Sequence, residues 1–128
     1  LGGNTNSNKE KFNPSILKID SFGNIEWSRS YKSNSREYHQ FKSTTTIDGD
    51  LVIVGSTIVE SSLGYVTNAF LSKFNKNGEI IWTRPYGTPD GDDWGWAVIE
   101  KPNRSLILIG STKSYNASLF DVYLVGIN

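Results

Sequence analysis

Short apolar runs alternate along the chain with turns rich in glycine, asparagine and aspartate, and this pattern predicts strands. Residues 51–57 and 106–112 are rich in β-branched side chains, which favour strands. Both runs are apolar at successive positions, so we expect each strand to be buried on both faces. Turns such as Phe22-Gly23 and Asn77-Gly78 predict short hairpins. Because no segment shows a sustained helical period with capping residues, we predict an all-β fold.

The same pattern occurs twice at a spacing of 55 residues. Residues 17–27 align without a gap with residues 72–82, and residues 51–57 align with residues 106–112 in the same register. The chain is expected to begin partway through one unit and to stop partway through another, and so to hold about two and a third units. The predicted boundaries are 1–14 for the end of a preceding repeat, 15–68 for the first full repeat, 69–121 for the second, and 122–128 for the start of a further repeat.

Each unit is predicted to contain four short antiparallel strands. The first strand of the unit is expected at 38–46 and 94–101, and the second at 51–57 and 106–112. The third is expected at 16–20, 69–75 and 122–128, and the fourth at 24–31 and 79–86. In such a meander, the turn between the first and second strands and the turn between the third and fourth strands lie at one end of the sheet. The connection between the second and third strands, and the connection to the next unit, lie at the other end. The first set is short and glycine-bearing. The second set is expected to be long loops, at 4–14, 32–37, 58–68, 87–93 and 113–121. We call this the long-loop end and expect any binding surface there, because rigid scaffolds display functional residues on loops.

The repeated residues resemble those of a known family. Gly55-Ser56-Thr57, Lys73-Phe74-Asn75, Gly78, Trp82 and Tyr86 resemble the tandem β-propeller repeats of secreted bacterial and archaeal proteins. The resemblance implies β-propeller blades, each a four-stranded antiparallel sheet, present here as an incomplete propeller. It also implies a secreted or cell-surface module of a larger protein, without a settled activity.

Large aromatic residues recur at fixed positions of the unit. Trp27 aligns with Trp82, and Tyr31 aligns with Tyr86. A residue that recurs in every unit is best explained by a structural role that every unit shares. We therefore expect these rings to pack between adjacent sheets. Stacking against sugars is the alternative.

Composition removes several classes of function. The 128 residues carry 13 Lys and Arg against 13 Asp and Glu, which weighs against a nucleic-acid binder. The basic residues are scattered, and no apolar run approaches the ~18 residues of a membrane span. The absence of cysteine excludes a disulfide framework and a zinc-thiolate site. Because the chain starts at Leu1 and has no methionine, we expect a mature secreted protein or an excised fragment.

Candidate ligand-binding residues lie where the two units differ most, at the segment 87–93. Asp90, Asp92 and Asp93 supply carboxylates of the kind that calcium prefers, but they lack the spacing of a recognisable calcium loop. We therefore expect a solvated acidic turn, and we predict no metal or cofactor. Trp94 faces this variable loop and is the best candidate for an exposed contact, whereas Trp96 is expected in the core.

No catalytic residue is predicted. His39 is the only histidine, and it aligns with Trp94, which favours a half-buried ring over a catalyst. A Ser-His-Asp arrangement would depend on this residue alone, and no Gly-x-Ser-x-Gly elbow supports it.

The leading hypothesis is therefore a non-catalytic extracellular or surface module with a structural, adhesive or interaction role. Its expected partners are other repeats of the same protein or copies of this chain, and a protein or glycan ligand. One alternative is a self-assembling subunit that completes its blades with other copies. Another is a quinone-dependent dehydrogenase, whose repeats also place Trp four residues after Gly, as at Gly23/Trp27 and Gly78/Trp82. That class is disfavoured by the missing cysteine pair and calcium cluster.

Overall fold

A computed structural model describes residues 2–8, 11–31, 38–62, 64–117 and 119–128. Every regular element in these ranges is a strand, so the all-β prediction is confirmed. The strands are β1 (Gly2–Asn8), β2 (Lys11–Ile19), β3 (Ile25–Ser30), β4 (Tyr38–Thr45), β5 (Leu51–Ser61), β6 (Gly64–Phe74), β7 (Ile80–Tyr86), β8 (Asp93–Glu100), β9 (Leu106–Thr112) and β10 (Asp121–Ile127). The described residues contain no helix with the length and apolar character needed to cross a membrane.

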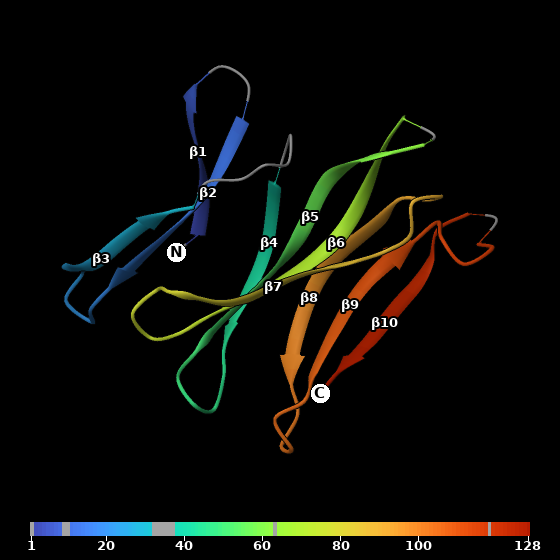
Figure 1. The fold of residues 1–128 in the computed structure, drawn as a ribbon. Helices are drawn as coiled ribbons and strands as arrows, with labels where there is room; N and C mark the ends of the chain where they lie inside the picture. Colours follow the sequence, from blue (N-terminus) through green and yellow to red (C-terminus); the bar gives the residue numbers. More distant parts are fainter. Residues whose placement is uncertain (1, 9–10, 32–37, 63, 118) are drawn as a thin grey trace.

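The strands form three antiparallel sheets that lie side by side in chain order (Figure 1). The N-terminal sheet has the order β1-β2-β3, the central sheet β4-β5-β6-β7, and the C-terminal sheet β10-β9-β8. Among the described residues, only the central sheet contains all four strands of the predicted unit. The predicted unit boundaries fall inside β2, β6 and β10, so each of the two full predicted repeats spans parts of two sheets.

In the described part of the chain, two hydrophobic clusters hold the sheets together, and β5 contributes to both. Ile53 packs with Ile16 of the N-terminal sheet, and Val52 packs with Leu108 of the C-terminal sheet. Successive side chains of a strand point to opposite faces, so one apolar run serves both neighbours. The predicted burial of both faces is confirmed for β5. In β9 it holds for one face only, because Ile107 and Ile109 are only half-buried.

A β-bulge in β8 corrects the prediction for Trp96. The pairing with β9 shifts between Gly95 and Ala97, which leaves Trp96 as the extra residue. Gly95 faces the central sheet, where an added Cβ would lie 2.6 Å from Val54 Cγ2. Trp96 points to the opposite face and is 46% exposed, and its indole N–H donates to Ser111 Oγ at 2.9 Å. The prediction that Trp96 lies in the core is therefore wrong.

Two predicted long loops are instead extended hairpins. In the segment 58–68, β5 and β6 continue to pair as far as Ser61 and Gly64. In the segment 4–14, β1 and β2 pair from Asn4 and Pro14 to Asn8 and Lys11. The backbone pairing of β5 with β6, and of β1 with β2, therefore continues through most of each predicted loop. The segment 32–37 lies outside the described residues, whereas 87–92 and much of 113–121 lie outside the strands, as predicted.

Candidate functional site

The repeated aromatic residues lie at the junctions between sheets. The ring of Tyr31 lies 5.1 Å from that of Phe74, and its hydroxyl donates to the Gly78 carbonyl at 2.5 Å. Trp27 contacts Gly78 so closely that an added Cβ there would lie 2.8 Å from the indole ring. The counterparts Trp82 and Tyr86 pack against the cluster between the central and C-terminal sheets. The prediction that these residues pack between sheets is confirmed.

The repeated Asp or Asn before the glycine turn has a local structural role. Asp20 Oδ1 accepts hydrogen bonds from the backbone N–H groups of Phe22 at 2.8 Å and Asn24 at 2.9 Å. Asn75 Oδ1 accepts the equivalent bonds from Asn77 and Glu79, each at 2.9 Å. The side-chain amide of Asn24 also donates to Asp20, which lowers the pKa of that carboxyl. The motif therefore specifies turns and packing.

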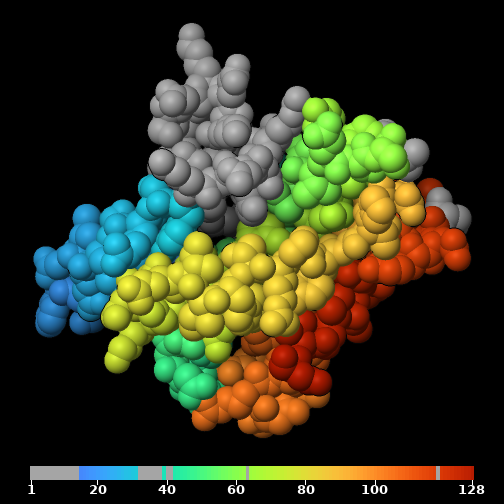
Figure 2. Space-filling view, in the orientation of Figure 1, coloured from blue at the N-terminus to red at the C-terminus, as the bar shows by residue number. Residues whose placement is uncertain are grey.

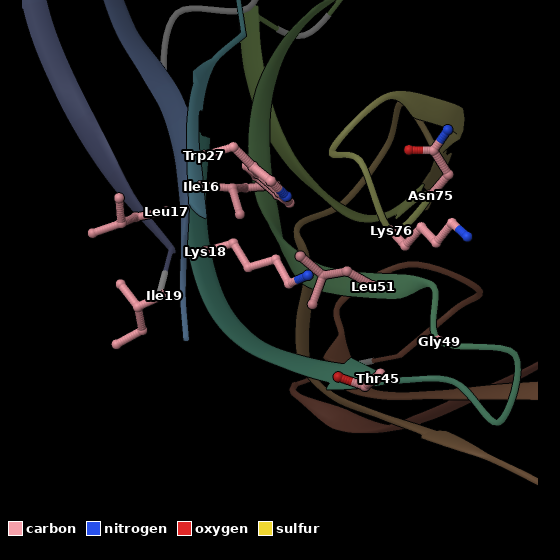
Figure 3. Close-up of a pocket in the computed structure, with 10 residues that line it drawn as sticks. All are labelled: Ile16, Leu17, Lys18, Ile19, Trp27, Thr45, Gly49, Leu51, Asn75 and Lys76. Atoms are coloured by element: carbon pink, nitrogen blue, oxygen red, sulfur yellow. The ribbon is translucent and has the colours of Figure 1, made fainter. Parts of the chain in front are cut away.

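A cavity of about 250 Å³ lies beside Trp27, at the end of the sheets that carries the short turns (Figure 3). Ile16, Trp27 and Leu51 line it between the N-terminal and central sheets. Since its walls are residues of the inter-sheet junction, we assign this cavity to the packing of the two sheets.

A second cavity, of about 310 Å³, opens at the long-loop end. Three segments that are far apart in the sequence meet there: the tip of the β5–β6 hairpin, the loop 87–92, and the segment after β9. The lining residues are Tyr65, Val66, Asp90, Gly91, Asp92, Lys113 and Ala117. We call this cavity the loop cleft. It contains two of the predicted residues, Asp90 and Asp92.

Hydrogen bonds fix the position of Asp92 in the loop cleft. The backbone N–H of Thr67 donates to Asp92 Oδ1 at 2.9 Å, and the N–H of Lys113 donates to the Asp92 carbonyl at 2.8 Å. Asp92 therefore joins all three segments of the cleft. Asp90 is exposed, and its backbone N–H donates to Thr88 Oγ1 at 3.3 Å.

Asp93 is completely buried and does not line the loop cleft. Its carboxylate accepts hydrogen bonds from the hydroxyls of Ser114, at 2.7 Å, and Thr112, and from the backbone N–H of Thr88 at 3.2 Å. An added Cβ at Gly87, where φ is +151°, would collide with this carboxylate. Asp93 anchors the loop to β9, and we assign it a structural role.

Trp94 is half-buried beneath the segment that follows β9. Its ring lies 4.8 Å from that of Phe120, and Lys113 Nζ lies 4.2 Å from the Phe120 ring centroid. Tyr115 stacks on Tyr123 with 5.9 Å between ring centroids. Burial raises the pKa of Tyr123, and its hydrogen bond with Tyr115 raises it further. Trp94 therefore belongs to the aromatic support of the loop cleft rather than to its lining.

Two other sequence expectations can be compared with the structure. His39 is exposed, so the expected half-buried ring is wrong; on β4 it pairs with Ser56 near the long-loop end. In the described part of the chain, no three or more His, Cys, Asp or Glu residues gather in a way that could hold a metal ion.

Sequence reasoning did not find Tyr65, Lys113 and Ala117 as lining residues. Tyr65 lay in a segment expected to be a loop, although the extended hairpin is what brings it to the cleft. The sequence indicated only where these residues would lie, because all three fall in connections that were predicted at the long-loop end.

Comparisons with known proteins add no relative: no family model matches the chain, and a search of curated proteins finds no match.

Proposed function

We propose that this chain is a non-catalytic β-propeller module with a structural and binding role at a cell surface or outside the cell. The observation that carries the proposal is the use of the repeated residues. Trp27, Tyr31 and Gly78 join one pair of sheets, and Trp82 and Tyr86 join the next. Sheets that lean on each other through the same positions of a repeat are typical of propeller blades.

The loop cleft is the proposed binding surface of this module. Asp90, Asp92 and Lys113 place charged groups around a cavity of about 310 Å³, and the exposed Tyr65 adds a hydroxyl. Concave sites with a few convergent polar groups are typical binding sites. Such groups hydrogen-bond sugar hydroxyls or peptide groups, so the proposed ligand is a glycan or an exposed segment of another protein.

A binding screen with matched variants tests this proposal. We expect wild-type protein to retain ligands on a glycan array or in a pull-down from surface proteins. Asp90→Ala and Lys113→Ala should weaken binding by about tenfold each, as expected for lost charge-assisted hydrogen bonds. The control is Asp48→Ala, which removes an exposed carboxylate paired with Arg104 at the opposite end of the sheets.

Two results would contradict the proposal. One is loss of binding in the Asp48→Ala control with the cleft variants intact. The other is turnover of a bound substrate by the purified protein, which would make the module an enzyme.

A further inference from the structure

One position of the repeat occurs in all three sheets, and its exposure differs sharply among them. Ile16 and Leu71 are 55 residues apart, and Leu124 pairs with Ile109 as Leu71 pairs with Val54. Ile16 is 3% exposed and Leu71 is 0% exposed, because the following sheet covers each of them. Leu124 is 65% exposed. The same apolar position is thus buried in two sheets and open in the third.

Leu124 belongs to a wider apolar surface, the outer face of the C-terminal sheet. Strand pairing places three rows of residues on this face: Trp94, Ser111 and Val122; Ala97, Ile109 and Leu124; and Ile99, Ile107 and Gly126. None of these nine residues is charged. Phe120 partly covers Trp94, whereas the row of Leu124 lies open. In the central sheet the corresponding face includes Val52, Val54 and Leu71, which form the junction with the next sheet. An open face of this composition marks an interaction surface.

The N-terminal sheet has a complementary open face. Ile19 aligns with Phe74, which is 5% exposed because it packs against Tyr31 of the preceding sheet. Ile19 itself is 42% exposed. In Figure 3 the side chains of Leu17 and Ile19 extend to the side of β2 opposite Trp27. The outer face of the N-terminal sheet is therefore the one that a preceding sheet would cover.

We propose that a second copy of this chain docks the outer face of its N-terminal sheet, around Ile19, onto the outer face of the C-terminal sheet, around Leu124. The molecule already contains this type of junction twice, between its first and second sheets and between its second and third. The docking repeats that junction between molecules, so it is a head-to-tail contact. Two copies bring together six sheets, which is within the four to eight blades common in propellers. The inference rests on the packing of the sheets and does not depend on a ligand in the loop cleft.

The expected association is weak. In the described residues, the N-terminal sheet starts with the counterpart of β5 and has no counterpart of β4. In the central and C-terminal sheets, β4 and β8 are the strands that lie against the preceding sheet. The junction between molecules is therefore smaller than the junctions within one molecule, and small interfaces dissociate on dilution.

Analytical ultracentrifugation of the 128-residue chain tests the docking. We expect the mass to rise from one copy to two between about 1 µM and about 1 mM, the range of weak protein association. Leu124→Lys and Ile19→Lys should each weaken association by about tenfold or more, because each would bury an unpaired ammonium group. Both positions are exposed in the monomer, so circular dichroism and the melting temperature should match those of wild type. Ile80→Lys is the control, since Ile80 is apolar, 51% exposed and on the edge strand β7.

Mixing the two variants distinguishes head-to-tail docking from other pairings. The Leu124→Lys protein keeps an intact N-terminal face, and the Ile19→Lys protein keeps an intact C-terminal face. One junction can form between them, so the mixture should recover association that neither variant shows alone. A monomer at every wild-type concentration would overturn the inference. So would association that survives Ile19→Lys, or a mixture that stays monomeric while the Ile80→Lys control associates.

Discussion

At the scale of single residues, equivalent positions of the repeat hold the same side chain in different surroundings. The Tyr31 hydroxyl donates to the Gly78 carbonyl at 2.5 Å. The Tyr86 hydroxyl is buried and forms no well-aligned hydrogen bond among the described residues, although the Arg84 guanidinium lies close to it. Burial raises the pKa of both tyrosines, and the nearby guanidinium of Arg84 partly offsets that rise for Tyr86. Comparing Tyr31 with Tyr86 therefore separates the contribution of the ring to the free energy of unfolding from that of the hydroxyl.

We predict that Tyr31→Phe lowers the free energy of unfolding by about 1 kcal/mol, since it removes a hydrogen bond and leaves a carbonyl without its partner. Tyr86→Phe should change the free energy of unfolding by less than about 0.5 kcal/mol or raise it, because it removes a buried hydroxyl that forms no well-aligned hydrogen bond. Urea denaturation of both variants measures the difference. Equal losses would contradict the assignment of the hydrogen bond.

Gly23 and Gly78 form a second matched pair. Both adopt positive φ, at 89° and 79°, where an added side chain costs about 1 kcal/mol. An added Cβ at Gly23 meets nothing within 4 Å, whereas one at Gly78 meets the Trp27 ring at 2.8 Å. We predict that Gly78→Ala destabilises the protein by about 1–3 kcal/mol more than Gly23→Ala, because overpacking at the junction adds to the backbone cost. Thermal or urea unfolding of the two variants would show this, and equal losses would mean that Trp27 does not pack on the next sheet.

At the scale of elements, Asp93 determines where the loop 87–92 lies. Its buried carboxylate ties the loop to Thr112 and Ser114 on the β9 side. Asp90, three residues earlier, is exposed in the same loop. The two residues look alike in the sequence but have different roles in the fold.

We predict that Asp93→Ala lowers the free energy of unfolding by about 2–4 kcal/mol, because it leaves several buried donors without an acceptor. Asp90→Ala should stay within about 0.5 kcal/mol of wild type, as is usual for exposed positions. Chemical denaturation measures both. An Asp93→Ala protein with the same free energy of unfolding as wild type would contradict the structural role of Asp93.

The strands could be predicted from the local sequence. The residue at which β5 ends and the burial of Trp96 could not. Glycine turns and β-branched runs placed the hairpin around Gly78 and the strand 51–57 correctly. The extension of β5 to Ser61 was missed because the pairing with β6 continues past the apolar run 51–57 from which the strand was predicted. Trp96 was misplaced because a bulge between Gly95 and Ala97 breaks the alternation on which burial was judged.

At the scale of the whole molecule, the repeat predicts neighbouring sheets joined through shared positions. Figure 2 shows β7 with its turn crossing the visible face, flanked by residues of the N-terminal sheet and residues near the C-terminus. Trp82 and Tyr86 of this strand lie in the cluster shared with the C-terminal sheet. The loop cleft was predictable only as a location, because its lining comes from three segments that the folded chain brings together.

The most direct test of how the sheets are joined is a nuclear Overhauser experiment on the protein in solution. We predict cross-peaks between the Trp27 indole protons and the Gly78 Hα protons, and between the rings of Tyr31 and Phe74, which lie 5.1 Å apart between centroids. These pairs are separated by more than 40 residues in the sequence, so only the packing of the first sheet on the second brings them into contact. With these resonances assigned and each hairpin showing its own internal contacts, the absence of both cross-peaks would contradict the account.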